Sequence, residues 1–168
     1  MSIKAKLESL KVGHALIIFE QYYRVEKISN YNEDGWKWPE LKLTNLDTNE
    51  THYLEWDEDD ELEIFLSTEK IDIEKLGLNL DPKEYDFKKV KGIKKLEYDG
   101  SKYKYDDDYS AVLDGKHKAK FFEFFCKKMN QSISIEYWYE NNDDKTKGFK
   151  VESYLCEQVR SANIEIVG

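Results

Sequence analysis

The chain has little of several residue types, and each scarcity excludes a class of protein. Its 168 residues include two cysteines, two prolines and eight glycines. So few prolines and glycines argue against long disordered linkers. The cysteines, Cys126 and Cys156, do not form a C-x-x-C or another ligand-like spacing, so zinc and redox chemistry have no support. We expect two buried thiols, with a disulfide between them as the alternative.

Positive charge and long apolar runs are scarce as well. The chain has 26 lysines and arginines against 35 aspartates and glutamates, which gives a net charge of −9 at pH 7. This balance opposes binding to nucleic acid and to anionic membranes, and weakly favours basic partners. The sequence shows no secretory signal and no apolar run long enough to span a bilayer. We therefore expect a cytoplasmic protein without direct membrane insertion.

Aromatic residues are abundant, at 14% of the chain, and they suit sheets better than helices. A chain of this length should bury roughly 70% of its unfolded surface, so its core needs no covalent or metal support. We predict a single domain over residues 1–168. It can be divided into two β-rich halves, 10–66 and 87–167, joined by a short helical connection at 67–86.

The first half is organised around the stretch from Trp36 to Leu66. Leu41 and Leu43 alternate with polar residues, and the same period of two continues through two further runs, which predicts three antiparallel strands with polar links. Two earlier strands would complete a five-strand meander. The remaining expectations for this half are a short helix within 2–11, strands at 15–19 and 22–28, and a polar loop at 29–35.

The second half contains the clearest local signal, Asp99-Gly100. This pair between alternating runs predicts a two-residue type I′ hairpin that places Leu96 opposite Tyr103. Residues 119–126 fit either a strand or a helix, and the strand is favoured because phenylalanine prefers it. The other expectations are a brief helix capped by Asp72, a turn at Asp81-Pro82, strands at 109–113, 132–139, 149–156 and 163–167, and a polar loop at 140–148.

These patterns predict a mainly β fold. Antiparallel meanders would form a two-halved β-sandwich or rolled barrel with one or two short helices. Each half has one long polar hairpin loop, so duplication of a β unit is a hypothesis, although no repeat is strong enough to assert it.

Four residues form the candidate surface for a partner or ligand: Trp36, Trp38, Glu40 and Trp138. Strict alternation would place Trp36 and Trp38 outside, but Pro39 cannot donate to a β-ladder and belongs at an edge or bulge. A bulge there would bring one or both tryptophans into the core. An exposed aromatic patch is the alternative, and tryptophan is a common interface anchor.

Two kinds of chemistry stay open as alternatives, although no nucleophile or glycine-rich motif is present and no catalytic residue is assigned. Glutamates beside aromatic residues could act on a sugar, and solvated strand positions are the plainer interpretation. Histidines with acidic loops could hold a metal ion, but no spacing supports a metal site and no cofactor is expected. The residues concerned are Glu40, Glu55 and Glu136 for the first, and His14, His52, His117 and the acidic run 57–61 for the second.

One order of aromatic and strand motifs runs through most of the chain. These motifs are Gly13, Tyr23-Arg24-Val25, Trp36-x-Trp38-x-Glu40-Leu41-x-Leu43, Tyr53-Leu54-x-Trp56, Ser134-Ile135-Glu136-Tyr137-Trp138 and Gly148. Their order resembles a bacterial domain-of-unknown-function family, catalogued as number 4178. The resemblance extends from about Leu10 onward and implies a β-rich cytosolic bacterial protein, an accessory role beside membrane-stress genes, and no catalytic residues.

The leading hypothesis is a non-enzymatic accessory or binding module that acts through contacts with another protein. A small carboxylate-dependent hydrolase or sugar-active enzyme is the first alternative, and a metal-dependent sensor is the second. The sequence does not specify the partner or the oligomeric state.

Overall fold

The computed structural model describes residues 1–79, 87–139 and 149–168. Over these residues it is mainly antiparallel β with two short α-helices, which confirms the predicted fold class. The elements in chain order are α1 (Ile3–Glu8), β1 (Ala15–Ile18), β2 (Gln21–Glu33), β3 (Trp36–Asn45), β4 (Thr51–Glu58), β5 (Leu62–Ile71), the 3₁₀ helix η1 (Ile73–Leu76), α2 (Phe87–Lys91), β6 (Lys95–Tyr98), β7 (Ser101–Leu113), β8 (His117–Cys126), β9 (Gln131–Tyr139), β10 (Phe149–Gln158), the 3₁₀ helix η2 (Ser161–Asn163) and β11 (Ile164–Ile166).

Hydrogen bonding joins the described strands in the order β11-β1-β2-β3-β4-β5-β10-β9-β8-β7-β6, and β2 also pairs with β7. The described chain forms two compact units. Unit 1 contains Met1–Asn30, Trp38–Ser67 and Gln158–Gly168, and unit 2 contains Tyr31–Lys37 and Thr68–Glu157. None of the helices in the described part of the chain has the length and apolar character needed to cross a membrane.

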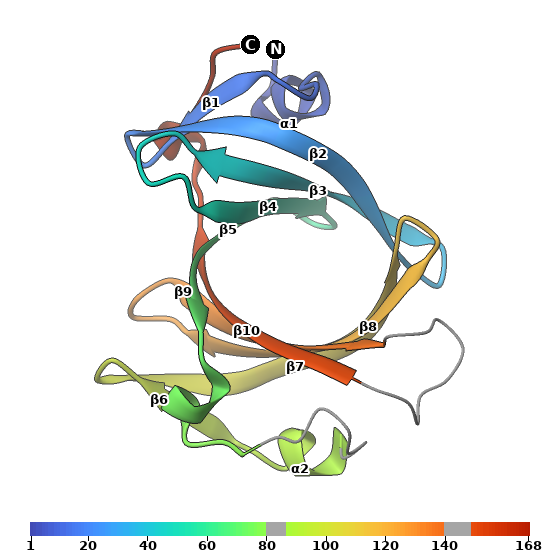
Figure 1. Ribbon diagram of the computed structural model, residues 1–168, viewed down its shortest axis with the longest axis vertical. Coiled ribbons are helices and arrows are strands. Elements are labelled where there is room, and N and C mark those ends of the chain that lie inside the picture. Colours follow the sequence, from blue (N-terminus) through green and yellow to red (C-terminus); the bar gives the residue numbers. More distant parts are fainter. Residues whose placement is uncertain (80–86, 140–148) are drawn as a thin grey trace. The chain divides into compact units, whose positions relative to one another are not determined.

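The core of unit 1 comes from alternate positions on its strands. Leu41 and Leu43 of β3 pack with Leu54 and Trp56 of β4, as the period of two predicts. Helix α1 adds Leu7, which is 1% exposed, and it lies beside β1 (Figure 1). This short helix is capped because Ser2 Oγ accepts a hydrogen bond from the Ala5 amide at 3.2 Å.

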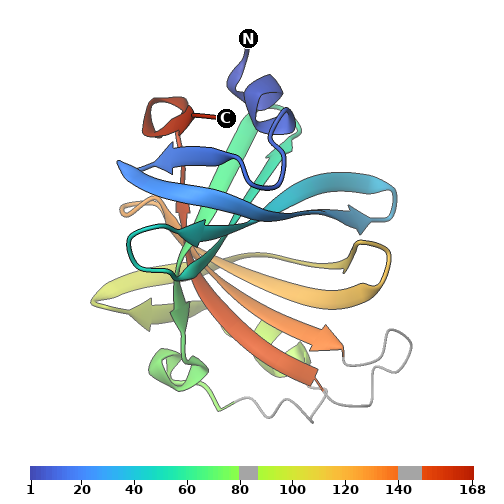
Figure 2. The same cartoon turned by 45° about the horizontal axis from the view of Figure 1, so that its top comes forward.

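The core of unit 2 is aromatic. Its long strands, coloured yellow to red in Figure 2, lie side by side, and β8 pairs with both β7 and β9. Phe122 and Phe124 of β8 are fully buried with Ile133, Ile135 and Tyr137 of β9. Residues 119–126 are therefore strand, as predicted, because both faces of β8 carry bulky side chains that fit a pleated sheet.

The hairpin prediction is confirmed residue by residue. Leu96 pairs with Tyr103, and Asp99 and Gly100 have φ of +50° and +79°, the positive values that a type I′ turn requires. The short helix after Asp72 is confirmed as η1, which ends at Gly77 with a left-handed φ of +73°, but the predicted cap is wrong because the Asp72 side chain makes no capping hydrogen bond. The predictions at Asp81-Pro82 and at 140–148 lie outside the described residues.

Three predicted strand boundaries are wrong, and each lies where pairing with another strand determines the extent of the strand. The expected polar loop at 29–35 is the end of β2, where buried Tyr31 pairs with Leu113 of β7. Strand β5 continues to Ile71 rather than stopping at residue 66, and the Ile71 carbonyl accepts a 2.6 Å hydrogen bond from Ser153 of β10. The predicted strand 109–113 is the end of β7, which runs from Ser101 with an irregularity between Tyr105 and Asp107.

Candidate functional site

The four predicted surface residues do not form one exposed patch. Trp36 begins β3 in unit 2 and is 48% exposed, whereas Trp38 is 9% exposed and Glu40 is 8% exposed, both in unit 1. Trp138 is half-buried on β9 of unit 2. Trp36 is thus exposed and Trp38 is buried, although both belong to β3. The buried Trp38 is not part of the apolar cluster that contains Leu41.

Three glutamates on adjacent strands lie on the same face of the sheet as Trp138. Glu136 is two residues before Trp138 on β9, so both side chains point to the same face. Across the β9–β10 ladder, Glu136 is directly opposite Glu152. Across the β8–β9 ladder, Glu136 faces Phe121, and Glu123 is two residues further along β8. We call Glu123, Glu136 and Glu152, with the aromatic residues that contact them, the carboxylate face of unit 2.

Each glutamate of the carboxylate face accepts a hydrogen bond from an aromatic side chain on its own strand or a neighbouring one. The Tyr109 hydroxyl donates to Glu123 Oε1 at 2.7 Å, and the Tyr154 hydroxyl donates to Glu152 Oε2 at 2.7 Å. The indole Nε1 of Trp138 donates to Glu136 Oε1 at 3.0 Å. These bonds restrict the rotamers of the carboxylates, so a ligand would meet acceptors that are already oriented.

The same face carries a cluster of four aromatic rings. Tyr109 and Phe121 stack with centroids 5.0 Å apart, and Trp138 meets Phe121 edge to face at 5.9 Å. Tyr31 of β2 packs against Phe121 at 5.6 Å and against Trp138 at 6.4 Å. Phe121 and Tyr31 are buried, whereas Tyr109 and Trp138 are half-buried and form the accessible part of the cluster.

Glu152 is an ionised carboxylate at neutral pH. Burial raises its pKa, but hydrogen bonds from Lys150 and Tyr154 and the charges of Lys150 and Lys70 outweigh burial and hold the pKa below its usual value. Its side chain is 11% exposed, and Lys70 Nζ lies 3.6 Å from its Oε1. A carboxyl group held in this way keeps its negative charge and accepts hydrogen bonds rather than donating them.

Apart from Glu136, the residues considered for the sugar-active and metal-binding alternatives do not belong to the carboxylate face. Glu40 and Glu55 are directly opposite each other on β3 and β4 of unit 1. His52 is buried, with Nδ1 2.7 Å from the Ser67 carbonyl oxygen. Within residues 1–79, 87–139 and 149–168, no three histidine, cysteine or acidic side chains are grouped so that they could hold a metal ion. Neither Cys126 nor Cys156 is in a disulfide, and Cys126 is the more buried.

The sequence contained a signal for the carboxylate face that went unnoticed. A glutamate stands two residues before an aromatic residue in both Glu136-x-Trp138 and Glu152-x-Tyr154. In a strand this spacing places the carboxylate and the ring on one face, within reach of each other. Glu123 could not be found in the same way, because its donor Tyr109 comes from the neighbouring strand.

Comparison with known families agrees with the resemblance noted in the sequence. Residues 11–157 match a family described as Domain of unknown function (DUF4178). The comparisons with curated proteins and with solved structures gave no match. Because the matched region covers most of the 168 residues, the chain belongs to the family Domain of unknown function (DUF4178).

Proposed function

We propose that this protein is a non-enzymatic binding protein, and that its carboxylate face receives a basic segment of a partner protein. The observation that carries this proposal is the set of three glutamates on adjacent strands, each oriented by a hydrogen bond from an aromatic side chain. Lysine and arginine side chains are the natural partners of such groups, because hydrogen bonds between ionised donors and acceptors are the strong ones.

The aromatic rings beside the carboxylates support the same ligand chemistry. Tyrosine and tryptophan faces attract ammonium and guanidinium groups, and arginine stacks on them. Trp138 and Tyr109 provide such faces next to Glu136 and Glu123. The net charge of −9 also favours the approach of a basic partner.

The pKa of Glu152 restricts the sugar-active alternative, because Glu152 could serve in it only as the ionised carboxylate. Glycoside hydrolysis by a carboxylate pair needs one carboxylic acid that is protonated at working pH, and therefore a raised pKa. The pKa of Glu152 is lowered instead, so this member of the Glu136–Glu152 pair cannot be the acid.

An accessory role in the cytoplasm of a bacterium belongs to this proposal. Free cysteines support a reducing compartment, because disulfides are rare there. The family resemblance supports a task beside membrane-stress proteins, carried out through protein contacts.

The test is a titration of the full chain with a synthetic peptide that alternates arginine with apolar residues, followed by calorimetry. We expect the double variant Glu136→Gln/Glu152→Gln to bind at least tenfold more weakly. A hydrogen bond to a charged group is worth about 1.5–3 kcal/mol, and 1.4 kcal/mol is a factor of ten. Circular dichroism of each variant checks that the fold is retained.

The matched control is Glu97→Gln, which removes an exposed strand glutamate from β6 of the same unit and should leave the affinity unchanged. Equal affinity for an acidic peptide of the same length would contradict the proposal. Turnover of a chromogenic glycoside by the unaltered chain, lost in Glu136→Gln, would instead establish the enzymatic alternative.

A further inference from the structure

The edge of β7 that faces away from β8 has a gap in its pairing. On this side β6 pairs with β7 over residues 101–104, and the Lys94 carbonyl then accepts a hydrogen bond from the Tyr105 amide at 2.9 Å. Further along the same side, β2 pairs with β7 at residues 112–113. In the described part of the chain, no strand pairs with residues 106–111 on this side. We call this stretch the open edge of β7.

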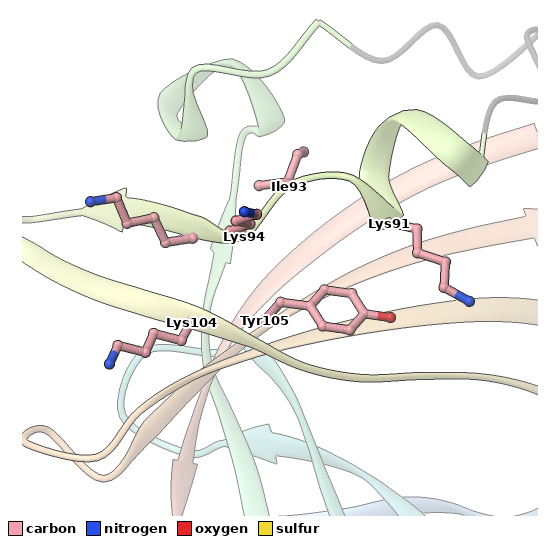
Figure 3. Close-up of a pocket in the computed structure, with 6 residues that line it drawn as sticks. Lys91, Ile93, Lys94, Lys104 and Tyr105 are labelled. Carbon is pink, nitrogen blue, oxygen red and sulfur yellow. The ribbon is translucent and has the colours of Figure 1, made fainter.

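The open edge exists because both neighbouring strands end at local turns. β2 stops at Glu33, since Asp34 and Gly35 have φ of +48° and +94° and form the turn into β3. At the other end, Figure 3 shows the chain turning from α2 through Ile93 into β6, while β7 continues beyond Tyr105. The two turns therefore set the length of β7 that is left for another strand.

Backbone groups on the open edge point away from β8. The Asp108 amide donates to the Asp107 carboxylate at 2.8 Å, so this carboxylate takes the place of the carbonyl that a neighbouring strand would provide. The irregularity between Tyr105 and Asp107 shifts the alternation of the strand by one residue. Because alternate residues direct their backbone groups to the same side, the Ser110 amide and carbonyl point the same way as those of Asp108. An antiparallel strand added here would pair with both residues.

Acidic side chains stand at both ends of the open edge. Asp106 and Asp107 are exposed at one end, and Glu33 and Asp34 lie at the other, where β2 stops. Burial raises the pKa of Glu33, and the charges of Asp107 and Asp34 raise it further, whereas the charge of Lys120 lowers it. The influence of Asp107 on Glu33 shows that the two ends of the open edge share one region of negative charge.

This negative charge lies on the same side of the sheet as the carboxylate face. Asp107 is directly opposite Glu123 on β8, so both side chains share that side. Glu33 is two residues after Tyr31, which packs on Phe121 of the same side, so the alternation of β2 places Glu33 there as well.

The other side of the sheet already holds positive charge beside the open edge. Asp108 lies on that side, with Lys120 Nζ 2.6 Å and Lys91 Nζ 3.9 Å from its carboxylate oxygens. A strand added to the open edge would thus meet carboxylates with one row of its side chains and an existing ion-pair network with the other. Basic residues therefore suit the first row, and uncharged residues suit the second.

We propose that the partner's basic segment binds as an added antiparallel strand along the open edge of β7, with its basic side chains beside Asp107 and Glu33. This inference rests on the proposed function and adds the backbone pairing that holds the segment. Main-chain hydrogen bonds to an exposed sheet edge are a recurring mode of peptide recognition, in which alternate side chains give specificity. The acidic ends also oppose pairing between two copies of this chain, because the same edge on a second copy carries the same charge.

The test is a calorimetric titration of the full chain with three peptides of one sequence, which alternates arginine with apolar residues. The first is unmodified, the second is N-methylated at its apolar residues, and the third is N-methylated at its arginines. In the proposed pairing, the apolar residues lie opposite Asp108 and Ser110 and direct their amides to β7. We expect the second peptide to bind at least tenfold more weakly than the first, because it lacks these donors. The third should bind like the first, because its methyl groups point away from β7.

A variant of the chain gives a second readout with the unmodified peptide. Glu33→Gln/Asp107→Asn removes two charges but keeps an oxygen acceptor for the Asp108 amide, and it should weaken binding. The control Glu97→Gln, on exposed β6, should leave binding unchanged.

The outcomes separate this inference from the proposed function. Equal affinities of the three peptides would overturn strand addition and leave the proposed function standing. Loss of affinity in the arginine-methylated peptide alone would overturn the antiparallel pairing. If the unmodified peptide did not bind, the proposed function would fall together with this inference.

Discussion

Replacement of Asp108 by asparagine should destabilise the protein by about 2 kcal/mol. Asp108 Oδ1 lies 2.6 Å from Lys120 Nζ, and the Tyr105 hydroxyl donates to Oδ2. Both charged side chains are mostly covered, with 20% exposure for Asp108 and 16% for Lys120. Two hydrogen bonds to a charged group, at about 1.5–3 kcal/mol each, would together contribute about 3–6 kcal/mol, and solvent screening at these partly exposed side chains lowers the expected loss below that sum, to about 2 kcal/mol. For a chain of this length, about 2 kcal/mol corresponds to a fall in melting temperature of roughly 4–8 °C.

The pH dependence provides a second measurement of the same contact. The hydrogen bond from Lys120 is the largest of the influences that lower the pKa of Asp108, followed by the one from Tyr105. A carboxyl whose pKa is lowered in the folded state stabilises the fold above its unfolded pKa, here 3.8, and loses that contribution as pH falls through the lowered value. The stability difference between Asp108→Asn and the unaltered chain should therefore be full at pH 6 and shrink below pH 3.8.

Urea unfolding of the double-mutant cycle Asp108→Asn and Lys120→Gln is the assay. We expect a coupling energy of about 1 kcal/mol or more, because the two residues share a direct contact. Asp106→Asn, an exposed neighbour in the same acidic run, should change stability by less than about 0.5 kcal/mol. Strictly additive effects of Asp108→Asn and Lys120→Gln, or equal losses in Asp106→Asn and Asp108→Asn, would refute the reasoning.

Two further predictions concern the fold of unit 2. Phe122 is fully buried against Tyr137, so Phe122→Ala should lower the free energy of unfolding, measured in urea, by about 3–5 kcal/mol. Phe125 is half-buried, so Phe125→Ala should lower it less. Equal losses in the two variants would contradict the assignment of Phe122 to the core. Gly100 has a φ of +79°, and a Cβ added there would meet open space. Gly100→Ala should therefore lower the free energy of unfolding by about 1–2 kcal/mol through backbone strain alone. An unchanged thermal midpoint would show that the hairpin is not type I′.

Local chemistry explains why some elements could be predicted. The Asp99-Gly100 turn needs two positive φ values, and the sequence provides the residues that tolerate them, so the register of Leu96 against Tyr103 follows without other information. The alternation through β9 likewise identifies its buried face, because period two leaves one arrangement that hides Ile133 and Ile135.

Other elements depend on partners far away in the sequence. The run after Ile28 contains serine, asparagine and tyrosine and was interpreted as a loop, but Tyr31 is buried through pairing of β2 with β7 and packing on Phe121. The end of β5 at Ile71 is similarly fixed by Ser153 of β10, 82 residues later. Local polarity cannot report such contacts, because a polar strand gains its stability from neighbours that its own sequence does not contain.

The candidate site likewise depends partly on local sequence and partly on the pairing of distant strands. Trp138 could be chosen from the sequence as a residue of interest, but its hydrogen bond to Glu136 and the presence of Glu152 opposite emerge from strand register.

The sequence by itself determined the mainly β class, the hairpin, the buried faces of the central strands and the family to which the chain belongs. These properties are set by backbone preferences and by periodicity over a few residues. The tertiary structure alone decided which carboxylates meet and which tryptophan is exposed. Side chains brought together by pairing between strands, such as Glu123 and Tyr109, leave no local pattern, so this part of the carboxylate face became visible only through strand register.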